Sequence, residues 1–221
     1  MGDKINLALI GAGHWGKNLA RVFHELGILK TICESSKEIL LKEAAKYPKI
    51  NTTSSFAEVL ASPDINAIAI ATQAEQHYSL AKKSLLADKH VFVEKPLSMT
   101  AQEGEDLVQI AKRQEKVLFV GHILQYHSAV QTVKRMLHEG ELGKLQYIYS
   151  NRLNLGKIRR GENILWSFAP HDISVILSLV GEEPLDVTAT GTNILHPNIA
   201  DTTVTNMKFS SGIGAHIFVS W

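Results

Sequence analysis

Three short segments of the chain carry side chains that can do chemistry. The first is Glu94-Lys95-Pro96, in which an acid and a base are followed at once by proline. A residue before proline is pushed toward an extended conformation, so Lys95 is expected to point away from the apolar run that precedes it. A lysine held in a crevice can hydrogen-bond a hydroxyl group or transfer a proton. The alternative is an exposed salt-bridging pair.

The second segment surrounds His171. Pro170 precedes a helical run, which predicts that His171 stands at the start of a helix. The positive end of a helix disfavours imidazolium, so His171 would be neutral near pH 7, as a general base must be. A capping or buried structural pair of His171 and Asp172 is the alternative.

The third segment has the form G-x-G-x-x-G. Gly11 permits a tight turn, Gly13 lets the backbone approach a pyrophosphate, and Gly16 lets a helix and a strand pack closely. The motif follows an apolar run and opens a helical segment, which is the context that a dinucleotide-binding site requires. His14 and Trp15 lie inside it and are candidate contacts.

An acidic residue completes this pattern. Glu34 lies 18 residues after Gly16, at the end of the next predicted strand, where it would accept hydrogen bonds from a ribose diol and repel a 2′-phosphate. We therefore expect NAD, and NADP is disfavoured. Thr72 and Gln73 follow a later strand, where a nicotinamide ribose could lie, and His77 is either a site contact or a surface residue. Beside a cationic nicotinamide, the pKa of Lys95 is expected to fall. The predicted cofactor contacts are Gly11, Gly13, His14, Trp15, Gly16, Glu34, Thr72, Gln73, His77, Glu94 and Lys95.

The three segments lie among predicted helices and strands, whose pattern differs between residues 1–121 and residues 122–221. Residues 1–121 alternate short apolar runs with helix-period segments, which predicts an α/β Rossmann-type doubly wound parallel sheet with ligands beyond the carboxyl ends of its strands. Residues 122–221 have helical segments at 128–138 and 171–180 and strand-like runs at 145–155, 186–192, 202–209 and 213–221. They predict a second, α+β domain for substrate binding and oligomerisation, with a mostly antiparallel open sheet. Since the sequence stops inside a strand, we expect it to be truncated at the C-terminus.

Composition narrows the class of protein. The chain has 221 residues, 45% of them apolar, and a formal net charge of +1 without long blocks of one sign, so neither a nucleic-acid nor a membrane surface is expected. One cysteine and the absence of a signal or spanning segment predict a soluble, cytoplasmic protein. His, Cys and carboxylates show no metal-ligand spacing, so no metal is expected.

Taken together, residues 11–16, 71–98 and the segment around His171 resemble the Gfo/Idh/MocA family of NAD(P)-dependent oxidoreductases. The resemblance implies a Rossmann domain, a second sheet whose face covers the nicotinamide, and homo-oligomers formed through that sheet. It also implies that Lys95 and His171 are the catalytic pair, without saying which is the base. Many members have an aspartate four residues before the histidine, where this chain has Ser167.

Within the family, residues 150–174 resemble dehydrogenases that oxidise UDP-N-acetylglucosamine, or its uronic acid, at carbon 3. The implied reaction passes a hydride from a secondary hydroxyl of a UDP-linked amino sugar to the nicotinamide. Substrate contacts, or else parts of a solvated loop, would be Arg152, Asn154, Arg159 and Asn163. Trp166 would form a wall of the sugar pocket or belong to the core, and Asp172 is a further candidate substrate contact. Alternatives are a dehydrogenase of inositol or another polyol, a non-catalytic NAD-binding regulator, and a glycosidase that works by transient oxidation.

Overall fold

The computed structural model describes residues 4–155, 158 and 162–221. The chain divides into two compact units, Met1–Gly121 and His122–Trp221. No helix of the described residues is both long enough and apolar enough to cross a membrane.

The first unit is built on a parallel sheet. Within residues 4–121 six strands lie in the order β3-β2-β1-β4-β5-β6, so the chain reverses direction across the sheet between β1 and β4. The predicted Rossmann-type fold is thereby confirmed. The strands are β1 (Leu7–Ile10), β2 (Leu29–Cys33), β3 (Asn51–Thr53), β4 (Ala67–Ile70), β5 (His90–Val93) and β6 (Leu118–Val120).

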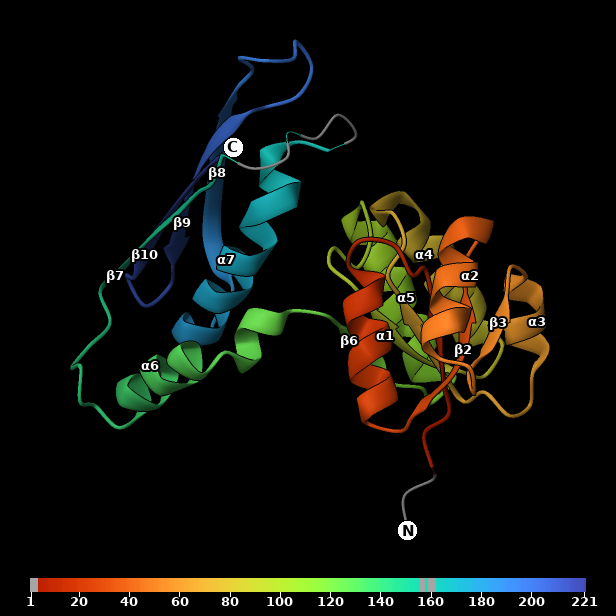
Figure 1. Ribbon diagram of the computed structural model, residues 1–221. Helices are drawn as coiled ribbons and strands as arrows, with labels where there is room; N and C mark the ends of the chain where they lie inside the picture. The colour runs from red at the N-terminus through yellow and green to blue at the C-terminus, as the bar shows by residue number, and fades with distance from the viewer. Residues whose placement is uncertain (1–3, 156–157, 159–161) are drawn as a thin grey trace. The chain divides into compact units, whose positions relative to one another are not determined.

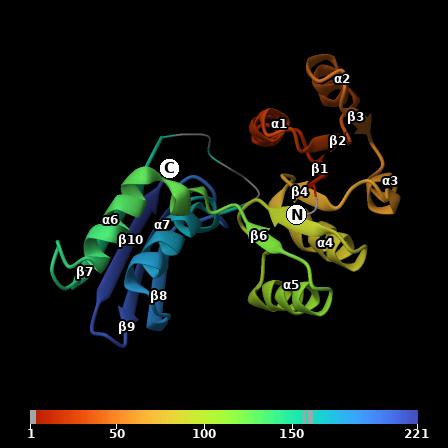
Figure 2. The ribbon, with the colours of Figure 1, turned by 90° about the horizontal axis from the view of Figure 1, so that it is seen from below.

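Helices cover both faces of this sheet. In Figure 2, α1 and α2 lie on one side of the strands and α4 and α5 on the other. Three helix starts are capped by side-chain oxygens: Ser36 for α2, Ser55 for α3 and Thr100 for α5. The helices are α1 (Gly16–Glu25), α2 (Lys37–Lys46), α3 (Phe56–Ala61), α4 (Ala74–Leu86) and α5 (Ala101–Arg113).

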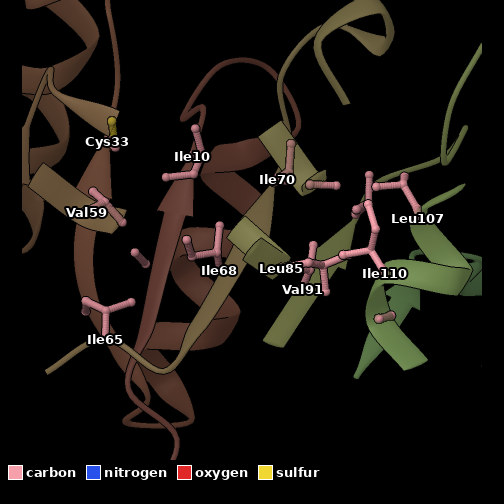
Figure 3. Close-up of a cluster of buried hydrophobic side chains, with 14 residues drawn as sticks. Ile10, Cys33, Val59, Ile65, Ile68, Ile70, Leu85, Val91, Leu107 and Ile110 are labelled. Atoms are coloured by element: carbon pink, nitrogen blue, oxygen red, sulfur yellow. The ribbon is translucent and has the colours of Figure 1, made fainter. Parts of the chain in front are cut away.

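The central strand β1 is buried on both faces because its apolar run does not alternate with polar residues. Leu7 and Leu9 pack into the cluster beneath α1, whereas Ala8 and Ile10 join the cluster beneath α4 and α5. Figure 3 shows the second of these clusters, in which Ile10 and Ile70 lie near the ends of their strands. A packed core therefore holds the carboxyl ends of β1 and β4, from which the glycine loop and Thr72 follow.

The second unit is a mixed sheet. Within its described residues, four strands run in the order β7-β10-β9-β8; β7 and β10 are parallel and the other pairs antiparallel. This confirms the predicted mostly antiparallel sheet. The elements are η1 (Ile123–Tyr126), α6 (Ser128–His138), β7 (Tyr147–Leu153), α7 (Ile164–Val180), β8 (Pro184–Thr192), β9 (Thr202–Phe209) and β10 (Gly214–Ser220).

Helix α7 covers one face of this sheet (Figure 1). Strand β10 alternates as the period of two requires: Ala215, Ile217 and Val219 are buried toward α7, and the residues between them are partly exposed. The helix begins seven residues earlier than predicted, at Ile164 instead of His171. Pro170 therefore lies inside it, which changes how His171 is placed.

Candidate active site

The glycine loop joins β1 to α1, and two of its glycines are required by close contacts. Gly11 has a φ of +89°, and a Cβ there would lie 2.8 Å from the carbonyl oxygen of Ala71. A Cβ on Gly16 would lie 2.0 Å from the carbonyl oxygen of Gly11, which no side chain can tolerate. Beside Gly13 the structure has nothing within 4 Å of that position. The loop is tightly folded and leaves open space at its middle glycine.

The N-terminus of α1 fits an anionic ligand. The N-cap residue Trp15 makes no side-chain cap hydrogen bond, and the first turn contains no acidic residue. The first N–H groups of a helix and its dipole favour phosphate at such an end. With the space beside Gly13, these features fit the pyrophosphate of a dinucleotide.

Glu34 lies at the loop as its spacing predicts. Its Oε2 accepts a hydrogen bond of 2.8 Å from the backbone N–H of Ala12, and its Oε1 accepts one of 2.9 Å from the backbone N–H of Ser36. The hydroxyl of Ser35 donates a third, at 3.2 Å. A carboxylate offers about four acceptor sites, so these bonds leave acceptor capacity for a ribose diol.

His77 is buried between the segments that follow β4 and β5. Its ring is 1% exposed, with Nδ1 2.6 Å from the carbonyl oxygen of Pro96 and Nε2 3.2 Å from that of Thr72. The interpretation of His77 as a surface residue is wrong. It joins α4 to the segments that follow β4 and β5, and can orient Thr72 from there. Gln73 is the N-cap residue of α4.

At the end of β5, Glu94 is linked to the glycine loop. The indole Nε1 of Trp15 donates a hydrogen bond of 2.7 Å to Glu94 Oε1. Glu94 is 8% exposed, and burial raises the pKa of its carboxyl, against the lowering effects of the Trp15 hydrogen bond and of Lys95. The Lys95–Pro96 peptide bond is cis. The segment that bears Lys95 thus begins at a residue hydrogen-bonded to the predicted dinucleotide loop.

The prediction that His171 begins a helix is wrong. Asn163 caps α7 by accepting a hydrogen bond of 3.0 Å from the backbone N–H of Trp166, and His171 lies about two helical turns further on. The dipole acts within the first turn, so it cannot hold His171 neutral. The longer helix places buried Ser167 four residues before His171, on the same face.

The predicted substrate contacts have different surroundings in the structure. Arg152 on β7 donates from Nε to Asp172 Oδ2 at 2.7 Å and from Nη2 to Oδ1 at 3.1 Å, while the Ser150 hydroxyl donates to Oδ1 at 2.7 Å. Arg152 and Asp172 are therefore partners in an ion pair between β7 and α7. Asn163 is occupied as the helix cap, and Asn154 is exposed at the end of β7. Trp166 is half-buried. Arg159 lies outside the described residues.

Comparison with known proteins decides the family. The model of the oxidoreductase family with an NAD-binding Rossmann fold matches residues 5–122, and that of the GFO/IDH/MocA C-terminal domain matches residues 130–221. The chain belongs to the Gfo/Idh/MocA oxidoreductase family. Of the described residues, no group of three or more His, Cys, Asp or Glu could hold a metal ion.

Two dehydrogenases of known activity are similar to this chain. UDP-N-acetylglucosamine 3-dehydrogenase from Acidithiobacillus ferrooxidans is 27% identical over 96% of this chain and 66% of its own length. Its solved structure superposes with a TM-score of 0.87, covering 98% of this chain and 69% of that one. Levoglucosan dehydrogenase from Pseudarthrobacter phenanthrenivorans is 26% identical over 81% of this chain and 52% of its own.

A further structure shares the fold. GenD2 from gentamicin A biosynthesis, solved in complex with NAD, has a TM-score of 0.91 at 20% identity, with 100% of this chain and 67% of that one covered. The chain thus spans roughly half to two thirds of the length of these proteins.

Sequence reasoning missed two features of the site. It did not predict the hydrogen bond between Trp15 and Glu94, which joins residues 79 positions apart. It also gave no role to Gly121, where a Cβ would lie 3.1 Å from the carboxyl carbon and both carboxyl oxygens of Glu94. The one local signal for the role of Gly121 was its position directly after β6.

Proposed function

We propose that this Gfo/Idh/MocA protein is an NAD-dependent dehydrogenase that oxidises a secondary hydroxyl of a sugar, with a UDP-linked amino sugar or its uronic acid as the preferred substrate. The two family models and the dehydrogenases among the relatives support the reaction class. The relative that acts on UDP-N-acetylglucosamine supports the substrate.

One observation carries the proposal. The Trp15–Glu94 hydrogen bond brings the end of β5 to the loop with dinucleotide-binding geometry, and Lys95 is the next residue. A lysine beside a dinucleotide loop, at the carboxyl end of a parallel strand, is where a substrate hydroxyl would need a proton-transferring group. Bound NAD supplies the hydride acceptor.

The roles of the chain's own residues follow from these positions. The glycine loop and the start of α1 bind the pyrophosphate, and Glu34 accepts hydrogen bonds from the adenosine ribose and selects NAD over NADP. Lys95 hydrogen-bonds the substrate hydroxyl, and Lys95 or His171 accepts its proton. A positioned base contributes about 100- to 10,000-fold to such a step.

A second candidate is a dehydrogenase of a sugar or polyol without a diphosphate. The Arg152–Asp172 ion pair favours it, because Arg152 was the described cation expected at the diphosphate and its charge is balanced by a carboxylate. The levoglucosan dehydrogenase among the relatives supports the same alternative.

Nicotinamide absorbance at 340 nm tests both candidates. Full-length protein is mixed with NAD and, in turn, UDP-amino sugars, their uronic acids, inositol and levoglucosan, and Lys95→Met is compared with Lys116→Met. Lys116 forms an ion pair with Asp88 ahead of β5 and β6, at the opposite ends of these strands. We expect reduction with one substrate class, lost in the Lys95 variant and kept in the control.

Two other outcomes would reject the proposal. NAD binding without reduction on any of these compounds would indicate a regulator. A cleaved sugar as the final product, with no net reduction, would indicate transient oxidation by a glycosidase.

A further inference from the structure

The carboxyl group of Glu94 is held from two sides by residues far away in the sequence. Trp15 Nε1 donates to it at 2.7 Å from the glycine loop. On another side lies Gly121, at the end of β6, whose missing side chain leaves just enough room for the carboxyl group. The backbone N–H of Glu94 itself donates to the carbonyl oxygen of Ile70 at 2.9 Å, which ties Glu94 to the end of β4. Glu94 is therefore fixed to three elements of the cofactor-binding unit.

A buried carboxylate needs compensation to remain charged. Burial raises the pKa of Glu94, whereas the Trp15 indole N–H, the backbone N–H and charge of Lys95, and the charge of His77 lower it. The titratable groups that bear on it are thus Lys95 on its own segment and His77 on α4. Trp15 and Gly121, which contact it from the glycine loop and the end of β6, carry no titratable group.

We propose that Glu94 is a positioning residue for Lys95, and that Trp15 links this positioning to the loop that takes the dinucleotide. Ionised Glu94, anchored at Trp15, directs the start of the Lys95 segment and keeps a negative charge beside the ammonium group. A dinucleotide seated at the glycine loop lies against the turn that bears Trp15, so cofactor binding and the state of Lys95 are coupled. This inference rests on the proposed function for the role of Lys95.

The first test does not require turnover. Reductive methylation of Lys95 is followed by peptide mass spectrometry across a pH series, because its rate reports the fraction of free amine. Glu94→Gln should speed labelling about threefold to tenfold at a given pH, since a loss of one pKa unit raises that fraction tenfold. Trp15→Phe should do so only at the acidic end of the series, where Glu94 without its indole donor becomes protonated.

Two comparisons isolate the Trp15–Glu94 hydrogen bond. In Glu94→Gln, adding Trp15→Phe should change the labelling no further, because the carboxylate is already gone. Trp221→Phe is the matched control: it removes an indole hydrogen bond of 2.9 Å to the carboxylate of Asp201 in the second unit. It should leave Lys95 labelling unchanged at every pH. Melting temperatures check that each variant is folded.

Kinetics give the second test once a substrate is known. Trp15→Phe should move the acidic limb of the kcat–pH profile to higher pH, because Glu94 loses the hydrogen bond that lowers its pKa. In the Glu94→Gln background the acidic limb due to Glu94 is absent. If an acidic limb due to His171 remains there, Trp15→Phe should not move it. Saturating NAD should alter Lys95 labelling in the natural protein more than in Trp15→Phe.

The outcomes separate this inference from the proposed function. Labelling and pH profile unchanged in Trp15→Phe, or the same effect of that substitution with and without Glu94, would overturn the inference. A natural protein that reduces no NAD on any sugar would overturn the proposed function, while the labelling experiment would still decide whether Glu94 and Trp15 act on Lys95.

Discussion

Replacing single glycines by alanine separates the two jobs of the glycine loop, which are folding tightly and admitting a ligand. At Gly16 the new methyl group would lie 2.0 Å from the Gly11 carbonyl oxygen, so backbone must move by about 1 Å to reach the shortest contacts that side chains make. We expect Gly16→Ala to lower the free energy of unfolding by about 3 kcal/mol. A loop displaced this far should also lose NAD affinity by about tenfold or more.

Gly13 and Gly27 are matched comparisons. At Gly13 nothing lies within 4 Å of the added methyl, so Gly13→Ala should change the free energy of unfolding by less than about 0.5 kcal/mol. The methyl would occupy the open space predicted for the pyrophosphate, so NAD affinity should fall about tenfold or more. Gly27 has a φ of +71° in equally open surroundings; its alanine variant should lose about 1 kcal/mol to backbone strain, with NAD affinity unchanged.

Urea unfolding measures the stabilities and titration calorimetry with NAD measures the affinities. The reasoning predicts a pattern: loss of stability and binding at Gly16, of binding alone at Gly13, and of stability alone at Gly27. If Gly13→Ala binds NAD as tightly as the natural protein, the pyrophosphate does not lie where the loop geometry indicates. If Gly16→Ala is as stable as the natural protein, the contact to Gly11 does not constrain the loop.

Four further predictions use other parts of the structure. Glu34→Ala should lower the ratio of NAD to NADP affinity by about tenfold or more, because it removes the carboxylate that repels a 2′-phosphate; calorimetry with both nucleotides measures it, and an unchanged ratio would contradict the assignment. Asp172→Asn should lower the free energy of unfolding in urea by about 2 kcal/mol, since it leaves the partly buried Arg152 charge without its counterion, and a neutral effect would show that the pair contributes little. Because the folded-state pKa of Glu94 is raised, its ionisation destabilises the protein as pH rises from the usual carboxyl range through that pKa; Glu94→Gln should therefore raise the melting temperature at neutral pH, by an amount that shrinks as the pH falls. Burial raises the pKa of Cys33 to about 11, so about one thiol in 1,000 is ionised at pH 8, and Ellman's reagent should react quickly only after unfolding.

The amino-acid sequence by itself determined the architecture of both units and the place of the dinucleotide loop. The reason is that these features are written in local patterns. Apolar runs alternating with helix-period segments specify a parallel sheet, and glycines at fixed spacing specify a turn between a strand and a helix. The contacts of Gly11 and Gly16 and the position of Glu34 are therefore as the spacing predicts.

The start of α7 could not be predicted from local sequence patterns. Proline inside a helix costs about 3 kcal/mol, so Pro170 indicated a helix boundary. The structure continues the helix through it, because the Asn163 cap and the burial of Ile164 and Ala169 against the second sheet offset that cost. Only these tertiary contacts show that His171 lies well inside a helix.

Pairings between distant residues were decided by the tertiary structure alone. Trp15 and Glu94 meet because β1 and β5 flank β4 in one parallel sheet, so the segments after their carboxyl ends lie at the same edge. Arg152 and Asp172 meet because α7 packs across β7. Spacing along the chain carries no information on such contacts: a side chain's partner depends on which elements the fold brings together, and that partner decides whether the side chain binds a ligand or holds the structure that does.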